Sequence, residues 1–349
     1  MSPHVLAILL FSISLGTIIT ISSSHWLFAW MGLEMSTLAI IPVMAQSHSP
    51  RAIEATMKYF ITQAIAAALL LFSGVTNAWL TGHWDISFMG HNSTTMMFTL
   101  ALALKIGLAP AHLWLPEVLQ GLDLTTGIIL STWQKLAPFA LLVQIQPLNP
   151  DMLISLGLLS TLIGGWGGLN QTQLRKILAY SSIAHLGWMA LVLQFSPALT
   201  LITLLTYIVM TSSTFLIFKF NKSLSINTLA TSWTKAPALT AFVPLVLLSL
   251  GGLPPLTGFL PKWMILQELT KQSLSLLATI AALTALLSLF FYLRLSYAMT
   301  LTMSPSNLNA VTSWRVYSTQ LSLPLSTTTI AATCLLPLTP GVMTLALLW

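Results

Sequence analysis

The sequence predicts an all-α integral membrane protein. Of its 349 residues, 56% are hydrophobic and only 6% are charged, whereas charged residues make up about 25% of an ordinary soluble domain. The mean hydropathy of +0.86 also indicates that lipid is the main solvent of the chain. Because a spanning helix needs about 20 apolar residues, most of the chain is expected to lie in the membrane, which excludes a large soluble catalytic domain.

Apolar stretches between polar, proline and glycine residues predict eleven transmembrane helices within one polytopic membrane domain, residues 1–349. The first basic residue is Arg51, so no charged region of a signal peptide precedes the first stretch, and we expect that stretch to remain as a span. The expected spans are 3–22, 25–45, 57–81, 96–121, 124–144, 151–169, 175–195, 198–220, 237–270, 274–300 and 321–347.

The basic residues predict the orientation of these spans. With eleven spans, Lys271 is the only basic residue in or beside a connection that falls on the side opposite the N-terminus. Cytoplasmic or matrix loops carry the excess of Lys and Arg, so we expect the N-terminus inside and the C-terminus outside. Arg294 is expected to reach the interface from within its span. The basic residues on the N-terminal side are Arg51, Lys58, Arg175, Lys176, Lys219, Lys222, Lys235 and Arg315.

Several classes of function are excluded by what the sequence lacks. The single cysteine, Cys334, cannot form an internal disulfide, a cysteine zinc site or a thiolate-ligated iron–sulfur cluster. The glycine cluster of residues 164–168 is followed by no Lys-Ser/Thr pair and lies inside a span, so it indicates close helix packing and no phosphate loop. We find no metal, nucleotide or nucleophile motif, and we expect the energy for any transport to come from elsewhere.

Three charged residues are predicted at mid-membrane depth: Glu34, Lys105 and Lys135. At 1.5 Å per residue none of them is near a helix end, and each costs about 2.5 to 3.5 kcal/mol unless it faces a protein interior. A static ion pair between Glu34 and Lys105 is one explanation, but it does not account for Lys135. A proton relay is the other, because burial disfavours a charged lysine whereas a nearby carboxylate favours it.

Two histidines are candidates for the same polar layer. His185 lies near the middle of the seventh expected span, and His112 follows a proline break in the fourth. Each is either a satisfied polar residue or a member of the relay. Polar residues that punctuate the spans, including Gln63 and Gln134, can bond to waters or to neighbouring helices.

Two of the expected spans are interrupted by a repeated motif. GLAPAHLWLPEV (107–118) matches GLPPLTGFLPKW (252–263) at an offset of 145 residues, with two prolines in the same frame. Proline bends a membrane helix, and Gly/Pro-interrupted spans in corresponding positions of two halves indicate an inverted repeat with its site at the breaks. The expected halves are approximately 3–144 and 151–300, followed by a C-terminal helix, 321–347. Lys262 follows the second break, where it is either a relay member or a lysine that reaches the interface.

Five segments carry a resemblance to a known family over essentially the whole chain: HWLFAWMGLEMSTLAIIP, SPRAIEATMKYF, LALALKIGLAPAHLWLPEVLQGLDLTTGIILSTWQKLAPF, LRKILAYSSIAHLGWM and GGLPPLTGFLPKW. The chain resembles the subunit 2 family of mitochondrial NADH:ubiquinone oxidoreductase, respiratory complex I, of vertebrate type. This family belongs to the antiporter-like subunits of the membrane arm.

The resemblance implies a function and roles for individual residues. Glu34 and Lys105 would form a modulating ion pair, Lys135 would be the central proton carrier, and Lys262 would be the lysine of the second broken helix. His112 and His185 would lie on the hydrated axis. The expected function is proton conduction across the mitochondrial inner membrane, driven by NADH oxidation and ubiquinone reduction in other subunits of this translocase.

The resemblance also implies partners and the absence of a resident cofactor. FMN, iron–sulfur clusters and ubiquinone would belong to partner subunits, and none of them to this chain. The expected partners are other membrane-arm subunits, including neighbouring antiporter-like subunits, together with accessory subunits and membrane lipids, and no nucleic acid. The expected orientation places the N-terminus on the matrix side and the C-terminus on the intermembrane-space side.

Two other functions are open at this point. A stand-alone cation/proton antiporter is disfavoured because a sodium site needs several carboxylate or carbonyl oxygens and Glu34 is the one mid-membrane acid. A scaffold without conduction would use the buried charges only to specify helix pairing. Retained activity after neutralising Lys105 and Lys135 together would favour the scaffold.

Overall fold

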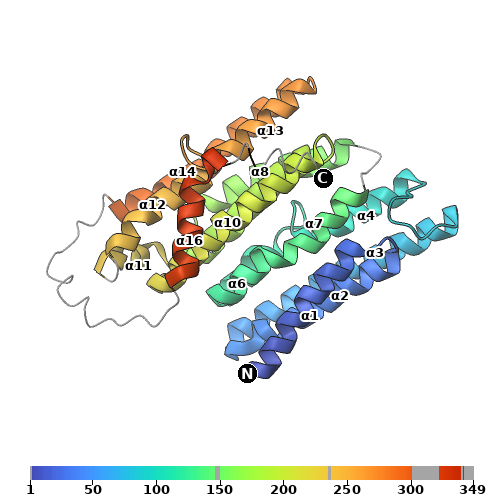
Figure 1. Ribbon diagram of the computed structural model, residues 1–349, viewed down its shortest axis with the longest axis horizontal. Helices are drawn as coiled ribbons and strands as arrows, with labels where there is room; N and C mark the ends of the chain where they lie inside the picture. Colours follow the sequence, from blue (N-terminus) through green and yellow to red (C-terminus); the bar gives the residue numbers. More distant parts are fainter. Residues whose placement is uncertain (1, 146–149, 235–236, 301–321, 339–340, 342–349) are drawn as a thin grey trace. The chain divides into compact units, whose positions relative to one another are not determined.

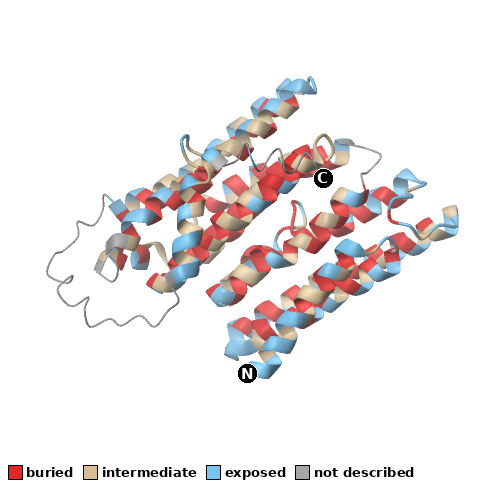
Figure 2. Cartoon of the chain, viewed as in Figure 1, coloured by how far each residue is buried: buried red, intermediate tan, exposed pale blue. Residues whose placement is uncertain are grey.

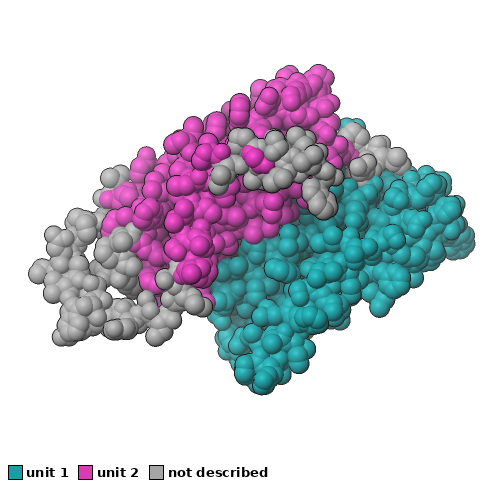
Figure 3. Space-filling model, viewed as in Figure 1, with its two compact units in different colours: residues 1–159 teal, residues 160–349 magenta. Residues whose placement is uncertain are grey.

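The computed structural model describes residues 2–145, 150–234, 237–300, 322–338 and 341 (Figure 1). Within these ranges the chain is helical, and its extended pairing is limited to two isolated bridges, His25 with Asp85 and Gln173 with Ser225. The predicted all-α class is confirmed. The chain forms two compact units, residues 1–159 and 160–349, coloured teal and magenta in Figure 3.

Unit 1 holds the first half of the helices, several of them short. The boundary with unit 2 lies inside α8. The helices are α1 (Pro3–Ser22), α2 (Trp26–Met44), η1 (Ala45–Ser47), α3 (Pro50–Thr81), α4 (Asn92–Ile106), α5 (Trp114–Gly121), α6 (Leu124–Ser131), α7 (Trp133–Ile145) and the first part of α8 (Pro150–Gly168).

Small residues allow α1 and α2 to approach closely. A Cβ atom on Gly16 would lie 2.7 Å from the carbonyl oxygen of Gly32, and one on Gly32 would lie 2.8 Å from that of Gly16. Small residues at such a crossing let two helix backbones meet, and this close packing favours helix association in lipid. Buried and exposed residues alternate along α2 and α3 (Figure 2), as expected for helices with one face toward protein and one toward lipid.

The long helix α3 has clear start and stop signals. Its N-cap Ser49 accepts a hydrogen bond from the backbone N–H of Ala52, and Pro50 takes the first helical position. It ends at Gly82, whose φ of +75° is the left-handed conformation that terminates many helices. Its 32 residues are more than a span of about 20 residues needs.

Unit 2 contains the second part of α8 and the remaining helices. The C-terminal helix α16 lies against α10 and α12, and Thr257 of the loop after α12 donates a hydrogen bond to the carbonyl of Ala332 in α16. The helices are α9 (Leu174–Val192), α10 (Pro197–Asn221), α11 (Ile226–Ala230), η2 (Thr231–Thr234), α12 (Pro237–Gly251), α13 (Phe259–Lys271), α14 (Ser275–Thr300), α16 (Ser322–Cys334) and η4 (Leu336–Leu338).

The glycine cluster in α8 packs tightly within unit 2. A Cβ atom on Gly164 would lie 2.6 Å from the backbone nitrogen of Ala184 in α9, and one on Gly168 would lie 2.8 Å from the ring of Phe291 in α14. Neighbouring helices therefore occupy the space that a larger side chain at these positions would need. The structure supports the packing interpretation of this cluster.

Six helices in the described ranges are long and apolar enough to cross a membrane. The expected number of eleven spans is not established by this criterion and stays a prediction. Part of the eleventh expected span, 321–347, lies outside the described residues, as do Lys235 and Arg315. The six are Pro3–Ser22, Trp26–Ser47, Pro50–Thr81, Leu124–Ile145, Pro197–Asn221 and Ser275–Thr300.

Both predicted proline breaks are present at matching positions. Helix α4 ends before Gly107, which has a φ of +88°, and α12 ends before Gly252, which has a φ of +79°. The peptide bonds Ala109–Pro110 and Pro254–Pro255 are both cis. The offset of 145 residues in sequence thus relates two breaks with the same backbone pattern.

Candidate functional site

The first candidate site is built around the break between α4 and α5. Lys105 lies in the last turn of α4. The N–H groups of Gly107 and Leu108 both donate to the carbonyl of Ala103 at 2.9 Å, which closes the helix end. The chain then runs without regular helix to Trp114, where α5 begins.

Two side chains satisfy the next carbonyls of α4. The indole nitrogen of Trp114 donates to the carbonyl of Leu104 at 3.2 Å, and the Gln63 amide of α3 donates to that of Lys105 at 3.5 Å. The last four carbonyls of a helix have no partner in the helix itself and need such donors when they are buried. Both donors therefore stabilise the backbone that carries Lys105.

The Lys105 side chain is buried, with 6% exposure. Within the described part of the chain its Nζ atom has no hydrogen-bond partner. The negative end of the α4 dipole lies in the same turn and favours a cation there. Lys105 is thus an ionisable group held in a protein interior, as its depth in the sequence predicts.

Lys135 follows a second interruption, between α6 and α7. Thr132 separates the two helices, and its hydroxyl donates to the carbonyl of Ile128 at 2.7 Å. Lys135 lies in the first turn of α7 and is only 4% exposed. Two buried lysines therefore occur beside two helix interruptions in unit 1.

One small cavity joins the two lysines. Its volume is about 20 Å³, enough for about one water molecule. Several lining groups can donate or accept hydrogen bonds, so a water held there would find polar partners. The residues that line it are Leu33, Ser36, Thr37, Tyr59, Gln63, Lys105, Ile106, Trp114, Leu130, Gln134, Lys135 and Pro138.

Glu34 of α2 lies close to this cavity without lining it. Its side chain is partly buried and acts electrostatically on Lys105. The Thr37 hydroxyl donates to the backbone carbonyl of Glu34 at 3.0 Å and lies 3.4 Å from its Oε2. Among the ion pairs of the described ranges there is none between Glu34 and Lys105, so the expected static pair is not present in this arrangement.

His112 lies inside the first break. It is 7% exposed, and its Nδ1 atom lies 3.1 Å from the carbonyl oxygen of Pro110. The two atoms share a hydrogen bond when Nδ1 carries the proton. The Nε2 atom is then an acceptor, which a proton relay requires.

Lys262 occupies the second break, in unit 2. Its Nζ atom donates to the carbonyl of Gly251, the last residue of α12, at 2.7 Å. The aliphatic part of the side chain lies against Gly252, where a Cβ atom would come within 2.9 Å of the lysine Cδ. The lysine therefore packs into the space that the glycine leaves.

His185 lies on α9 in unit 2 and is partly buried. Its ring lies 5.7 Å from that of Tyr207 on α10, at a tilt of 46°. The structure thus places Lys105 and Lys135 at one cavity, His112 and Glu34 in the same unit, and Lys262 and His185 in unit 2.

Some residues of the first site were not singled out from the sequence. Trp114 and Tyr59 line the cavity, with ring centroids 5.8 Å apart. Gln134, expected from the sequence to bond to water or to a neighbouring helix, donates to the carbonyl of Ser36 at 3.3 Å. The position of Trp114 inside the repeated motif was the available signal. Nothing local distinguishes Tyr59 from an ordinary core residue, because its role depends on the fold.

Arg294 has a specific partner. Its guanidinium donates to the carbonyl of Leu169, just beyond the end of α8, at 2.7 Å. We expected this arginine to reach the membrane interface from its span. The structure shows that its guanidinium bonds to the end of a neighbouring helix, and its reach to the interface stays a prediction.

Comparison with known proteins identifies the family of the chain. Residues 23–288 match a family model described as NADH:quinone oxidoreductase/Mrp antiporter, transmembrane, and residues 289–343 match one described as NADH dehydrogenase subunit 2 C-terminus. The chain is 68% identical over 345 residues to NADH-ubiquinone oxidoreductase chain 2 of Tetraodon nigroviridis, with 99% of both chains covered. It belongs to the NADH-ubiquinone oxidoreductase chain 2 family. The corresponding chain of Salmo salar is 69% identical over 346 residues, 99% of each.

Solved structures share the chain 2 fold. A chain of respiratory complex I from Thermus thermophilus superposes with a TM-score of 0.84 at 28% identity, covering 100% of this chain and 79% of the other. A chain of the Mrp complex from Dietzia sp. gives a TM-score of 0.82 at 16% identity, with coverages of 97% and 76%. These findings confirm the predicted antiporter-like membrane fold and the resemblance on which it was based.

Proposed function

We propose that this chain 2 family member is a membrane-arm subunit of the proton-pumping NADH:ubiquinone oxidoreductase of the mitochondrial inner membrane, and that it conducts protons through the groups identified above. Membership of the family supports the role of the chain in the complex. The observation that carries the proton path is the pair of buried lysines, Lys105 and Lys135, at one small polar cavity.

Two lysines at one buried cavity can exchange a proton. Two positive charges in a poorly solvated space repel each other, so a proton on Lys105 disfavours one on Lys135. A movement of Glu34 toward Lys105 would hold the charge on Lys105, and its withdrawal would release that proton. Water in the cavity would connect the ammonium of one lysine with the neutral amine of the other, because Gln134 and Thr37 offer it partners.

The remaining proposed members extend this path. His112 would carry protons at the first break, and His185 and Lys262 would carry them in unit 2, Lys262 being nearest the outside. The subunit would perform no redox step itself, and FMN, iron–sulfur clusters and ubiquinone would be bound by partner subunits. Those partners would include neighbouring antiporter-like subunits, with accessory subunits and lipids around them. The N-terminus would face the matrix and the C-terminus the intermembrane space.

The rival antiporter function is not favoured. Sodium ions need several oxygen ligands, whereas the cavity of unit 1 is lined by two lysine ammonium groups. Native electrophoresis of mildly solubilised membranes with an NADH dehydrogenase stain tests this point first. We expect the chain to migrate with a large NADH-oxidising band, and migration as a small oligomer with sodium flux in liposomes would support the antiporter.

The proton path is tested by Lys135→Met in the assembled complex, with Lys271→Met as the control. Lys271 is 62% exposed and pairs with Glu268 at 3.5 Å, so its substitution removes a lysine without touching the buried lysines of the cavity. We expect the first variant to assemble and to translocate fewer protons per electron, and the second to behave as the unmodified complex. Unchanged pumping in a double variant, Lys105→Met with Lys135→Met, would instead identify a scaffold.

A further inference from the structure

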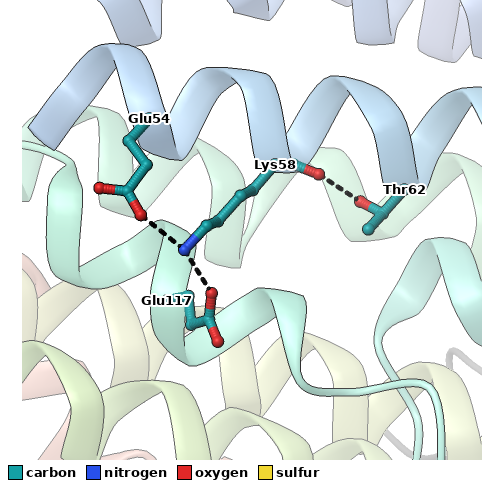
Figure 4. A network of polar contacts seen from close by, with 4 residues as sticks. All are labelled: Glu54, Lys58, Thr62 and Glu117. Carbon is teal, nitrogen blue, oxygen red and sulfur yellow. Dashed lines mark hydrogen bonds and ion pairs between the residues drawn. The ribbon is translucent and has the colours of Figure 1, made fainter. Parts of the chain in front are cut away.

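A second cluster of charged groups lies outside the cavity, on α3 and α5 of unit 1. The ammonium of Lys58 lies 2.7 Å from Oε1 of Glu54 and 2.7 Å from Oε2 of Glu117 (Figure 4). Glu54 is on the same helix as Lys58, four residues earlier. The Lys58–Glu117 pair is therefore the charged contact between the two helices, and we call it the α3–α5 ion pair.

The helices joined by this ion pair are those that hold the end of α4. From α3, Gln63 donates to the carbonyl of Lys105, and from α5, Trp114 donates to that of Leu104. Gln63 lies five residues after Lys58, and Trp114 lies three residues before Glu117, so each donor is about one turn from the ion pair. The two helices also meet through the rings of Tyr59 and Trp114.

Helix α5 depends on such contacts because it is short. It has eight residues, and isolated helices shorter than about 12 residues are marginal. On its N-terminal side the chain has no regular helix between Gly107 and Trp114. Its placement, and with it the position of the Trp114 indole, is thus determined by packing against neighbours, among which α3 is a major one.

We propose that Lys58 and Glu117 are positioning residues for proton transfer at Lys105: their ion pair holds α5 on α3, so that Trp114 and Gln63 stay on the last carbonyls of α4. The expected effect on pumping rests on the proposed function, whereas the attachment of α5 to α3 does not depend on it. Without the pair, α5 is held less firmly on α3, the bond from Trp114 to the carbonyl of Leu104 is broken more often, and the ammonium of Lys105 can turn to that carbonyl instead of to the cavity.

The ion pair is accessible, which sets the size of the effect. The side chains of Lys58 and Glu117 are 42% and 53% exposed. Exposed pairs contribute little to stability, so we expect proton pumping per electron to fall by about two- to five-fold and the complex to stay assembled. Glu54 provides a matched control, because its bond to Lys58 lies within α3 and does not reach α5.

The test compares variants in the complete complex. Lys58→Met and Glu117→Gln are each expected to lower the proton-to-electron ratio and to speed hydrogen–deuterium exchange of the α5 amides, residues 114–121. Glu54→Gln is expected to do neither. The exchanged pair, Lys58→Glu with Glu117→Lys, restores opposite charges across the two helices and is expected to recover most of the ratio, as is Lys58→Arg alone.

The outcomes separate this inference from the proposed function. Unchanged hydrogen–deuterium exchange of α5 in Lys58→Met and Glu117→Gln overturns the positioning role, regardless of whether Lys105 and Lys135 carry protons. An equal loss of pumping in Glu54→Gln and Glu117→Gln also overturns it, since a proton-collecting surface would then be the better explanation. Faster α5 exchange together with normal pumping in Lys135→Met would uphold the attachment of α5 and refute the proton path.

Discussion

The ammonium of Lys262 donates a 2.7 Å hydrogen bond to the carbonyl of Gly251, the residue at which α12 ends. Carbonyls of a last helical turn lack donors and carry the negative end of the helix dipole. At the end of α4 the same need is met by the neutral side chains of Trp114 and Gln63. Of these three donors only Lys262 is ionisable. Loss of a proton from its ammonium would therefore weaken its hydrogen bond to the carbonyl of Gly251.

Gly252→Ala is predicted to destabilise the second break and to displace Lys262. The φ of +79° at Gly252 costs an alanine about 1–2 kcal/mol. The added Cβ would also lie 3.0 Å from the lysine Nζ. We expect a lower melting temperature of the complex and fewer protons translocated per electron.

Gly82→Ala is the control for this substitution. Gly82 has a similar φ of +75°, and nothing lies within 4 Å of a Cβ placed there. The backbone cost is therefore alike, but no side chain is displaced. Equal losses of pumping in both variants would show that the contact with Lys262 does not matter.

The proline breaks were predictable from sequence because their cause is local. Proline removes a helical hydrogen bond wherever it stands, and the glycines before it supply the left-handed residues at which α4 and α12 end. The depth of Lys105 and Lys135 in apolar stretches also predicted their burial. A charged side chain in the middle of such a stretch must face the protein interior, because the lipid around the helix does not solvate it.

The interruption at Thr132 was not predicted, and neither were the α4 carbonyls to which Trp114 and Gln63 donate. The hydroxyl of Thr132 is bonded to the carbonyl of Ile128, but threonines inside unbroken helices make the same bond, as Thr76 does to Phe72 in α3, so this bond is no sequence signal of a break. Trp114 and Gln63 reach the carbonyls of α4 from other helices. Such contacts depend on the tertiary arrangement, which sequence periodicity does not contain.

Gly164→Ala is predicted to destabilise unit 2. The new Cβ would lie 2.6 Å from the backbone nitrogen of Ala184, and the backbone cannot turn away as a flexible side chain could. Overpacking of this kind costs about 1–3 kcal/mol, more than the gain of about 1 kcal/mol in helix propensity. Thermal unfolding of the purified complex measures the loss.

Gly74→Ala is the matched substitution in α3. Its nearest neighbour would be the Phe98 ring at 3.8 Å, an ordinary contact, so only the gain in helix propensity applies. We expect its melting temperature to be equal to or above that of the unmodified complex. A fall as large as that of Gly164→Ala would contradict the packing argument.

Arg294→Met is predicted to loosen the end of α8. The variant keeps most of the aliphatic stem and removes the donor to the carbonyl of Leu169. A hydrogen bond from a charged group contributes about 1.5–3 kcal/mol. We expect faster hydrogen–deuterium exchange around 166–171, and no such change in Arg51→Met, whose residue is exposed on α3.

Trp114→Phe is predicted to lower pumping by releasing one carbonyl beside Lys105. Phenylalanine keeps a ring next to Tyr59 but cannot donate to Leu104, and the loss of such a bond costs about 0.5–1.5 kcal/mol. Trp30→Phe removes a comparable indole bond, 3.1 Å long, to the carbonyl of Ala67 in the middle of α3. Both variants lose one donor, but only Trp114 lies at a broken helix end, so only its loss is expected to reduce the proton-to-electron ratio. Equal reductions in the two would mean that general packing, and not the end of α4, governs transfer at Lys105.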